Sequence, residues 1–133
     1  MDRQTIAEFE ARYNLVLPEA YIRFLLLCDG KPEEYCKGFP DIALFTLAEI
    51  AEAREYMEMK TYCPEYVAIG DGGGGEVLIM PQERNTETLI VTHGGNLISR
   101  YIKPQYCKFF YDFFSGWVSC GCPAAEIDEM YDG

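Results

Sequence analysis

The residues with the clearest potential for chemistry lie in a glycine-rich segment near the middle of the chain. Residues 70–76 have the sequence Gly-Asp-Gly-Gly-Gly-Gly-Glu, which formally matches the G-x-G-x-x-G pattern of dinucleotide-binding loops. Such a loop must open a helix whose N-terminus holds the pyrophosphate, whereas residues 77–80 (Val-Leu-Ile-Met) predict a strand. We therefore favour a turn between strands, where glycine permits positive φ. Binding of a nucleotide or another small ligand by Gly70–Glu76 is the alternative.

The single histidine and the six cysteines are the other groups that could support catalysis or bind metal. His93 lies in a Gly/Asn turn signal, which favours an exposed imidazole without a catalytic role, although folding could bring a partner to it. Cys120 and Cys122 form the only close pair of thiols, whereas a zinc site needs two such pairs or suitably spaced histidines. No carboxylate pair stands in an apolar setting suited to acid–base work. The sequence thus predicts no catalytic residue, no metal and no cofactor.

The cysteine content also bears on the compartment. Residues 1–5 carry charges of both signs and no apolar stretch of the kind found in secretory signals. We therefore expect a cytoplasmic protein whose cysteines are reduced thiols. They are Cys28, Cys36, Cys63, Cys107, Cys120 and Cys122.

Acidic residues dominate the charge of the chain. There are 22 Asp plus Glu against 11 Lys plus Arg, a formal net charge of −11. This field disfavours direct nucleic-acid binding and attracts basic proteins. Candidate partner-binding acids gather around the first long loop and beside the glycines: Asp29, Glu33, Glu34, Asp41, Asp71 and Glu76. The alternative for each of them is a solvated surface that serves solubility.

Length and composition predict one globular domain. The 133 residues are 49% hydrophobic, which suits a single core. No apolar run approaches the ~18 residues needed to span a membrane. We expect one domain over residues 1–133, with a core at about 5–118 and an acidic tail at about 119–133.

The first half of the chain has helical patterns. Thr5-Ile-Ala-Glu8 predicts a capping box, and an apolar face follows at Ile6, Phe9 and Tyr13. Pro18 predicts the first position of a second helix, which Gly30 ends. Residues 31–40 predict a loop. A second capping box at residues 46–49 opens a helix that is predicted to run to about Lys60.

The second half is richer in β-branched residues and predicts strands. They are expected at residues 66–69, 76–80, 88–92 and 96–102, with a hairpin turn at residues 93–96. Aromatic residues then recur at helical spacing and predict an amphipathic C-terminal helix: Tyr106, Phe109, Phe110, Phe113, Phe114 and Trp117. The expected fold is α+β, with a mostly antiparallel sheet flanked by N-terminal helices and this aromatic-rich helix.

Three segments in this order resemble the SUKH superfamily. The first runs from Phe9 through Leu17-Pro18, Tyr21 and Phe24-Leu25 to Gly30, the second is Tyr66–Glu76, and the third is the aromatic helix ending near Trp117. The resemblance covers about residues 5–118. It implies a curved sheet flanked by helices, and the matched residues have structural roles in caps, turns and core.

The resemblance also implies a function through protein binding. Many bacterial members are immunity proteins that bind and neutralise toxins, often nucleases, and a fungal branch regulates cell-wall assembly. Our first hypothesis is an immunity protein that binds and neutralises a secreted, basic toxin domain, in the first instance a nuclease. The alternative is a cytosolic regulatory or scaffold domain.

Overall fold

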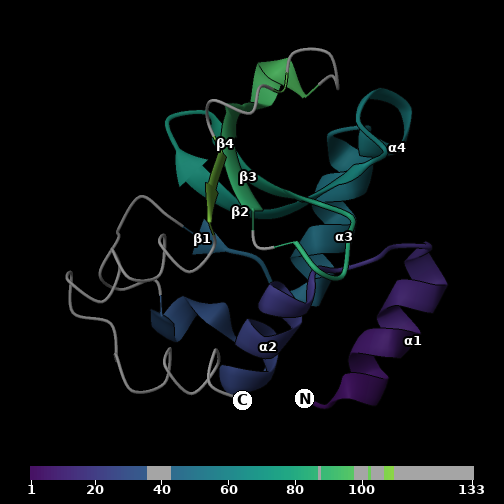
Figure 1. The fold of residues 1–133 in the computed structure, drawn as a ribbon. Coiled ribbons are helices and arrows are strands. Elements are labelled where there is room, and N and C mark those ends of the chain that lie inside the picture. Colours follow the sequence, from purple (N-terminus) through teal and green to yellow (C-terminus); the bar gives the residue numbers. More distant parts are fainter. Residues whose placement is uncertain (36–42, 87, 98–101, 103–106, 110–133) are drawn as a thin grey trace.

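The computed structural model describes residues 1–35, 43–86, 88–97, 102 and 107–109 (Figure 1). Its helices are α1 (Arg3–Tyr13), α2 (Glu19–Leu27), α3 (Leu47–Tyr56) and α4 (Met59–Tyr62), with short 3-10 turns η1 (Pro32–Tyr35) and η2 (Gly94–Asn96). Its strands are β1 (Ala43–Leu44), β2 (Tyr66–Gly73), β3 (Glu76–Pro81), β4 (Thr88–His93) and β5 (Cys107–Phe109). The predicted α+β class is confirmed.

The five strands form one antiparallel sheet in the order of the sequence, β1-β2-β3-β4-β5. The register of β2 against β3 shifts twice, between Ala68 and Gly70 and between Asp71 and Gly73. Such shifts are bulges, which bend and twist a strand. These two bulges in β2, just before the glycine turn, are a local cause for the curvature expected of the sheet.

Both faces of the sheet are buried, because its apolar side chains alternate between two cores. One core packs against α1, α2 and the first half of α3, and includes Val67, Ile69, Leu78, Met80 and Leu89. The other packs against the end of α3 and α4, and includes Ala68, Val77, Ile79 and Ile90. The helices are thus held to the sheet from two sides (Figure 1).

The capping of α1 differs from the prediction. The helix begins at Arg3, and the Asp2 carboxylate accepts hydrogen bonds from the Thr5 N–H (2.9 Å) and the Thr5 hydroxyl (2.8 Å). Thr5 is therefore inside the first turn, and the predicted capping box at Thr5–Glu8 is wrong. Asp is at least as favourable as Thr at the N-cap. The sequence pattern alone therefore does not decide whether Asp2 or Thr5 caps the helix.

The ends of α2 lie one or two residues from the predicted positions. Pro18 is the N-cap and Glu19 the first helical residue. At the other end the Gly30 N–H donates to the Leu25 carbonyl (2.8 Å), and Asp29 takes the left-handed conformation with φ 52°. This is a Schellman arrangement, in which Asp29 as well as the predicted Gly30 (φ 74°) has positive φ.

The predicted helix from residue 46 to Lys60 is two helices. Its capping box is confirmed: the Glu49 N–H donates to the Thr46 hydroxyl (3.2 Å), and the Thr46 N–H donates to the Glu49 carboxylate (3.0 Å). The helix then breaks at Glu58, which has φ 51°. The break turns Met59 into the second core, where it is fully buried.

Two predictions for the second half need correction. Asn96 belongs to η2, and the neighbour of β4 on its outer side is β5, which pairs Ile90 with Cys107. Cys107–Phe109 is thus a strand where a helix was predicted, because its backbone pairs with β4 across the sheet. The rest of the predicted strand, the remainder of the aromatic helix and the acidic tail lie outside the described residues, apart from Leu97 and Ile102.

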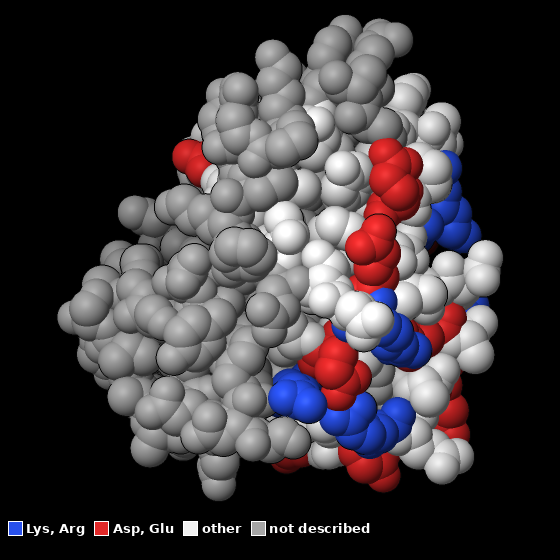
Figure 2. Space-filling view, in the orientation of Figure 1, with Lys and Arg blue, Asp and Glu red and all other residues white. Residues whose placement is uncertain are grey.

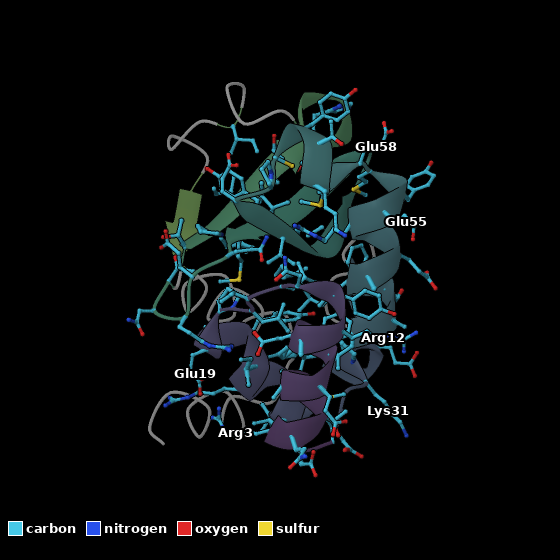
Figure 3. The ribbon with its side chains drawn as sticks, turned by 90° about the vertical axis from the view of Figure 1, so that its right-hand side faces the viewer. Arg3, Arg12, Glu19, Lys31, Glu55 and Glu58 are labelled. Carbon is cyan, nitrogen blue, oxygen red and sulfur yellow. The ribbon has the colours of Figure 1, made fainter. Side chains whose placement is uncertain are left out.

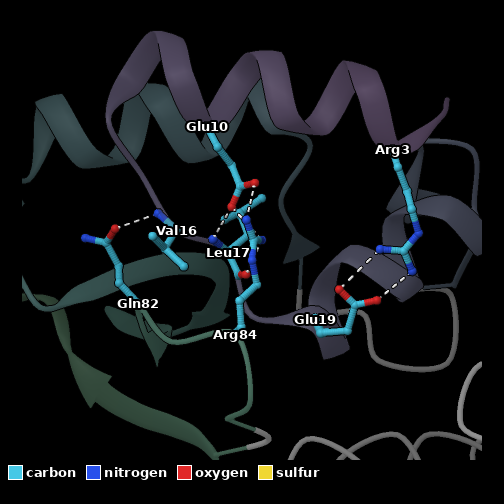
Figure 4. Close-up of polar contacts among 7 residues, drawn as sticks. All are labelled: Arg3, Glu10, Val16, Leu17, Glu19, Gln82 and Arg84. Atoms are coloured by element: carbon cyan, nitrogen blue, oxygen red, sulfur yellow. Dashed lines mark hydrogen bonds and ion pairs between the residues drawn. The ribbon is translucent and has the colours of Figure 1, made fainter.

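A polar cluster joins the α1–α2 connection to the loop after β3 (Figure 4). Glu10 is almost fully buried and pairs with Arg84 through two contacts of 2.7 and 2.8 Å. The same carboxylate accepts the Leu17 N–H at 2.7 Å, and Arg84 donates to the Leu17 carbonyl at 3.0 Å. Beside it, the Val16 N–H donates to the Gln82 side chain at 2.9 Å. We call Glu10, Arg84, Leu17, Val16 and Gln82 the helix–loop clasp.

We expect Glu10→Ala to lower the free energy of unfolding by about 2–3 kcal/mol. The Leu17 N–H would lose its acceptor and Arg84 its partner, although Arg84 is half-exposed and can be hydrated. The exposed pair Arg3–Glu19 is the control, and Arg3→Ala should change stability by less than about 1 kcal/mol. Urea denaturation measures both free energies of unfolding. Equal losses would show that the Glu10–Arg84 pair stabilises the fold no more than the exposed Arg3–Glu19 pair does.

Candidate protein-binding surface

The glycine segment forms a tight hairpin between β2 and β3. Gly74 and Gly75 occupy its two turn positions with φ of 59° and 85°, as a two-residue hairpin turn requires. The Gly94 N–H donates to the Gly75 carbonyl at 2.8 Å, which ties the turn to the end of β4. Because strand β3 follows, the helix that a dinucleotide loop needs is not there, and the turn between strands is confirmed.

The polar residues of this hairpin make local contacts. The Asp71 carboxylate accepts the Gly73 N–H at 2.8 Å and so supports the bulge before the turn. Glu76 is exposed and lies opposite His93 in the β3–β4 register. His93 is exposed as expected, and its Nδ1 accepts the Gly95 N–H at 3.1 Å. These contacts shape the turns and assemble no catalytic group.

The acids of the first long loop have different surroundings. Asp29 is exposed and forms an ion pair with the N-terminal ammonium of Met1, which lowers the pKa of Asp29. Glu33 is exposed on η1, and η1 contacts β1, whose Ala43 lies opposite Asp71. Asp71 pairs with Val77 in the β2–β3 register, so Asp71 and Glu76 face opposite sides of the sheet next to the hairpin. The side chain of Glu34 and the whole of Asp41 are outside the described residues.

Several acids near α1 and α2 are neutralised within the chain. Glu19 pairs with Arg3 at 2.5 Å and with Arg23 at 3.5 Å, and the Arg3 hydrogen bond lowers the pKa of Glu19. Glu10 is neutralised by Arg84. In Figure 2 acidic and basic side chains are interleaved in the lower part of the described surface, in agreement with these pairs. Glu10 and Glu19 therefore offer a basic partner little uncompensated charge.

A second acidic surface, which the sequence analysis did not single out, covers α3 and α4. Tyr56 is 86% exposed and Tyr62 46% exposed, and they are two of the few large hydrophobic side chains on the described surface. Glu52, Glu55 and Glu58 are also exposed, and none of the three forms an ion pair or side-chain hydrogen bond with another described residue. Figure 3 shows Glu55 and Glu58 on the same flank of the molecule. We call these five residues the α3–α4 face.

The one cation within α3 does not neutralise this face, because it is turned inward. Arg54 is only 7% exposed, and its Nη1 donates to the Tyr66 carbonyl at 3.2 Å. Its Nε has no partner among the described residues, and burial lowers the pKa of this guanidinium. Lys60 on α4 is the exposed cation nearest in sequence. Figure 3 also shows Arg12 of α1 on the flank that carries Glu55, so Lys60 and Arg12 reduce the negative charge of the three acids of the α3–α4 face without matching it in number.

Helical geometry applied to the third predicted helix could have found this face. Glu49, Glu52 and Tyr56 recur at i, i+3 and i+7, which places them on one side of a helix. The opposite side carries the buried Leu47, Ile50 and Ala53. An exposed tyrosine on the polar side of a helix is the signal in the sequence.

The described residues contain neither a metal-binding cluster nor a membrane-spanning helix. No group of three or more His, Cys, Asp or Glu side chains is arranged there to hold a metal ion. Within the same residues, no helix has the length and apolar character needed to cross a membrane.

Comparison with protein families gives one match. The sequence model of the SMI1 / KNR4 family (SUKH-1) matches residues 1–119. The chain belongs to this family. Neither a curated protein nor a solved structure gives a significant match.

Membership of SUKH-1 confirms the resemblance drawn from the sequence. Domains of this family are known as immunity proteins or cell-wall regulators and are generally non-catalytic. Their action depends on contacts with other proteins, so the domain fits a protein-binding module. Within the described residues, the exposed acidic surfaces above are candidates for such contacts.

The two turn glycines give a paired test of the hairpin. A Cβ on Gly74 would meet nothing within 4 Å, whereas one on Gly75 would lie 3.0 Å from His93 Nε2. Gly74→Ala should cost about 1 kcal/mol of stability through its positive φ alone. Gly75→Ala should cost about 2 kcal/mol, because His93 must also move. Urea denaturation compares them, and an equal or smaller loss at Gly75 would contradict the packing of His93 against the turn.

The state of Cys63 can be tested by alkylation. Cys63 is a fully buried thiol without a disulfide, and burial raises its pKa to about 11. At about pH 8 both its burial and its neutral form should protect it from iodoacetamide in the native protein. Denaturation without reductant should make it reactive, as located by peptide mass spectrometry. Lack of reaction after denaturation would instead indicate a disulfide at Cys63.

Proposed function

We propose that this chain is a bacterial immunity protein that binds a basic toxin domain, a nuclease in the first instance, and thereby neutralises it. The observation that supports this proposal most strongly is the distribution of charge. The chain has a net charge of −11, and exposed acids without partners in the described residues lie on the α3–α4 face. Family membership supplies the second support, because SUKH-1 domains include immunity proteins.

The mechanism needs no chemistry on the side of the inhibitor. A nuclease holds nucleic acid on a basic surface, since phosphate contacts supply much of its affinity. An acidic protein that covers that surface excludes the substrate both by its bulk and by its charge. Complementary fields also accelerate the encounter of the two proteins. In this proposal the protein acts in the cytoplasm, where it meets a toxin that has entered the cell.

The acids predicted from the sequence have a defined part in this proposal. Glu33, Asp71 and Glu76 are exposed and contribute to the long-range field, together with Glu34 and Asp41 of the first long loop. Asp29 contributes less, because the Met1 ammonium already compensates it. Steering requires charge of the right sign on the approaching side, and it does not require direct contact.

The proposal is tested with a toxin domain encoded beside the gene for this chain. Co-expression of the chain should restore growth of cells that produce the toxin. Association of the purified proteins should slow about tenfold between roughly 0.05 and 0.5 M salt, while dissociation changes much less, because salt screens long-range attraction. Surface-based kinetics across a salt series measures both rates.

Two results would count against this function. Lack of protection and of binding would leave the regulatory or scaffold role as the better hypothesis. Binding whose association rate is indifferent to salt would show that the acidic surface serves solubility alone.

A further inference from the structure

The most unusual exposed side chain in the described structure is Tyr56. A solvent-facing tyrosine at 86% exposure makes few contacts within its own domain, yet α3 presents it between carboxylates. Glu52 lies one helical turn before it, and Glu55 is its neighbour in sequence. Tyrosine is among the residues that most often dominate the energy of protein interfaces.

The charges around Tyr56 act against the stability of the isolated helix. Glu49, Glu52 and Glu55 follow one another at spacings of three residues, so like charges are neighbours on the surface. Arg54, which could relieve this repulsion, is buried and bonded to the Tyr66 carbonyl. A basic partner would remove the repulsion, and its binding would therefore be favoured by the charge pattern of this helix.

The geometry identifies the chemistry of the partner. We propose that the α3–α4 face is the contact surface for the basic toxin domain, with an arginine or lysine of the toxin packed on the Tyr56 ring. A cation over an aromatic face is attracted by its quadrupole, and carboxylates on either side can bind the same guanidinium or its neighbours. Tyr62 and Glu58 extend the surface along α4. This inference rests on the function proposed above and assigns its interface.

A second copy of this chain fits the face poorly. The face carries an excess of negative charge, and two such surfaces would repel each other. The exposed acids Glu33 on η1 and Asp71 and Glu76 at the β2–β3 hairpin are the competing location for the toxin. They are acidic as well, but among the side chains that the structure describes no exposed aromatic ring lies next to them in sequence.

The test compares charge reversals of equal size at the two locations. Glu55→Lys and Glu33→Lys change the net charge by the same amount, and both residues are exposed. We expect both to slow association with the toxin by about twofold to fivefold through the long-range field. Only Glu55→Lys should also accelerate dissociation, by about tenfold, because only Glu55 would contact the bound toxin.

Tyr56 is tested by a truncation and by a conservative variant. Tyr56→Ala should raise Kd about thirtyfold, mainly through faster dissociation, as expected for an interface anchor. Tyr56→Phe keeps the ring and should stay within about threefold of the wild type. Because Tyr56 is so exposed, both variants should unfold within about 2 °C of the wild type.

The outcomes separate this inference from the proposed function. Tight binding by Tyr56→Ala and Glu55→Lys, with the loss of affinity found at Glu33→Lys instead, would overturn the α3–α4 interface and leave the immunity function standing. Absence of binding by the wild-type chain would overturn both. Sedimentation velocity of the chain alone completes the test, since a Tyr56-dependent dimer would assign the face to self-association.

Discussion

The arrangement of helices over the sheet depends on the ion pair between the buried Glu10 and the half-exposed Arg84. These residues are 74 positions apart, and their contact fixes the α1–α2 connection against the loop after β3. The pair also satisfies both backbone groups of Leu17, which would otherwise be buried at a chain reversal without partners. An apolar contact could hold the same elements together, but it would not specify which residue of the connection meets which residue of the loop.

The fixed position of α2 determines in turn where α3 lies. The hydroxyl of Tyr21, which is fully buried on α2, donates to the carbonyls of Phe45 (2.5 Å) and Ile69 (3.2 Å). Phe45 immediately precedes the cap of α3, and its own N–H donates to the Ile69 carbonyl at 2.8 Å. One side chain thus connects α2, the start of α3 and strand β2. With both faces of the sheet covered, the outer sides of the helices and the ends of the hairpins are left for recognition.

The sequence predicted those features that depend on neighbours along the chain. The capping box of Thr46, the core positions of α1 and the glycine turn follow from local rules and are confirmed. The break at Glu58 and strand β5 were mispredicted, because burial of Met59 and pairing with β4 are decided by tertiary contacts. The Glu10–Arg84 pair had no local signal at all. The candidate acids were found by composition, yet composition does not tell which acids are already neutralised.

Because only some acids have cationic partners within the chain, the net charge of −11 is spread unevenly over the surface. Three acids next to α1 and α2, Glu10, Glu19 and Asp29, form ion pairs with arginines or with the Met1 ammonium, so their charge is neutralised within the fold. On α3 the one arginine is turned into the core, so the outward acids of that helix have no cation on their own element. A basic protein that approaches the molecule is therefore attracted more strongly to some faces than to others. Tyr56 stands among the acids that lack internal partners, and a ring in that position adds short-range contact where long-range attraction is already present.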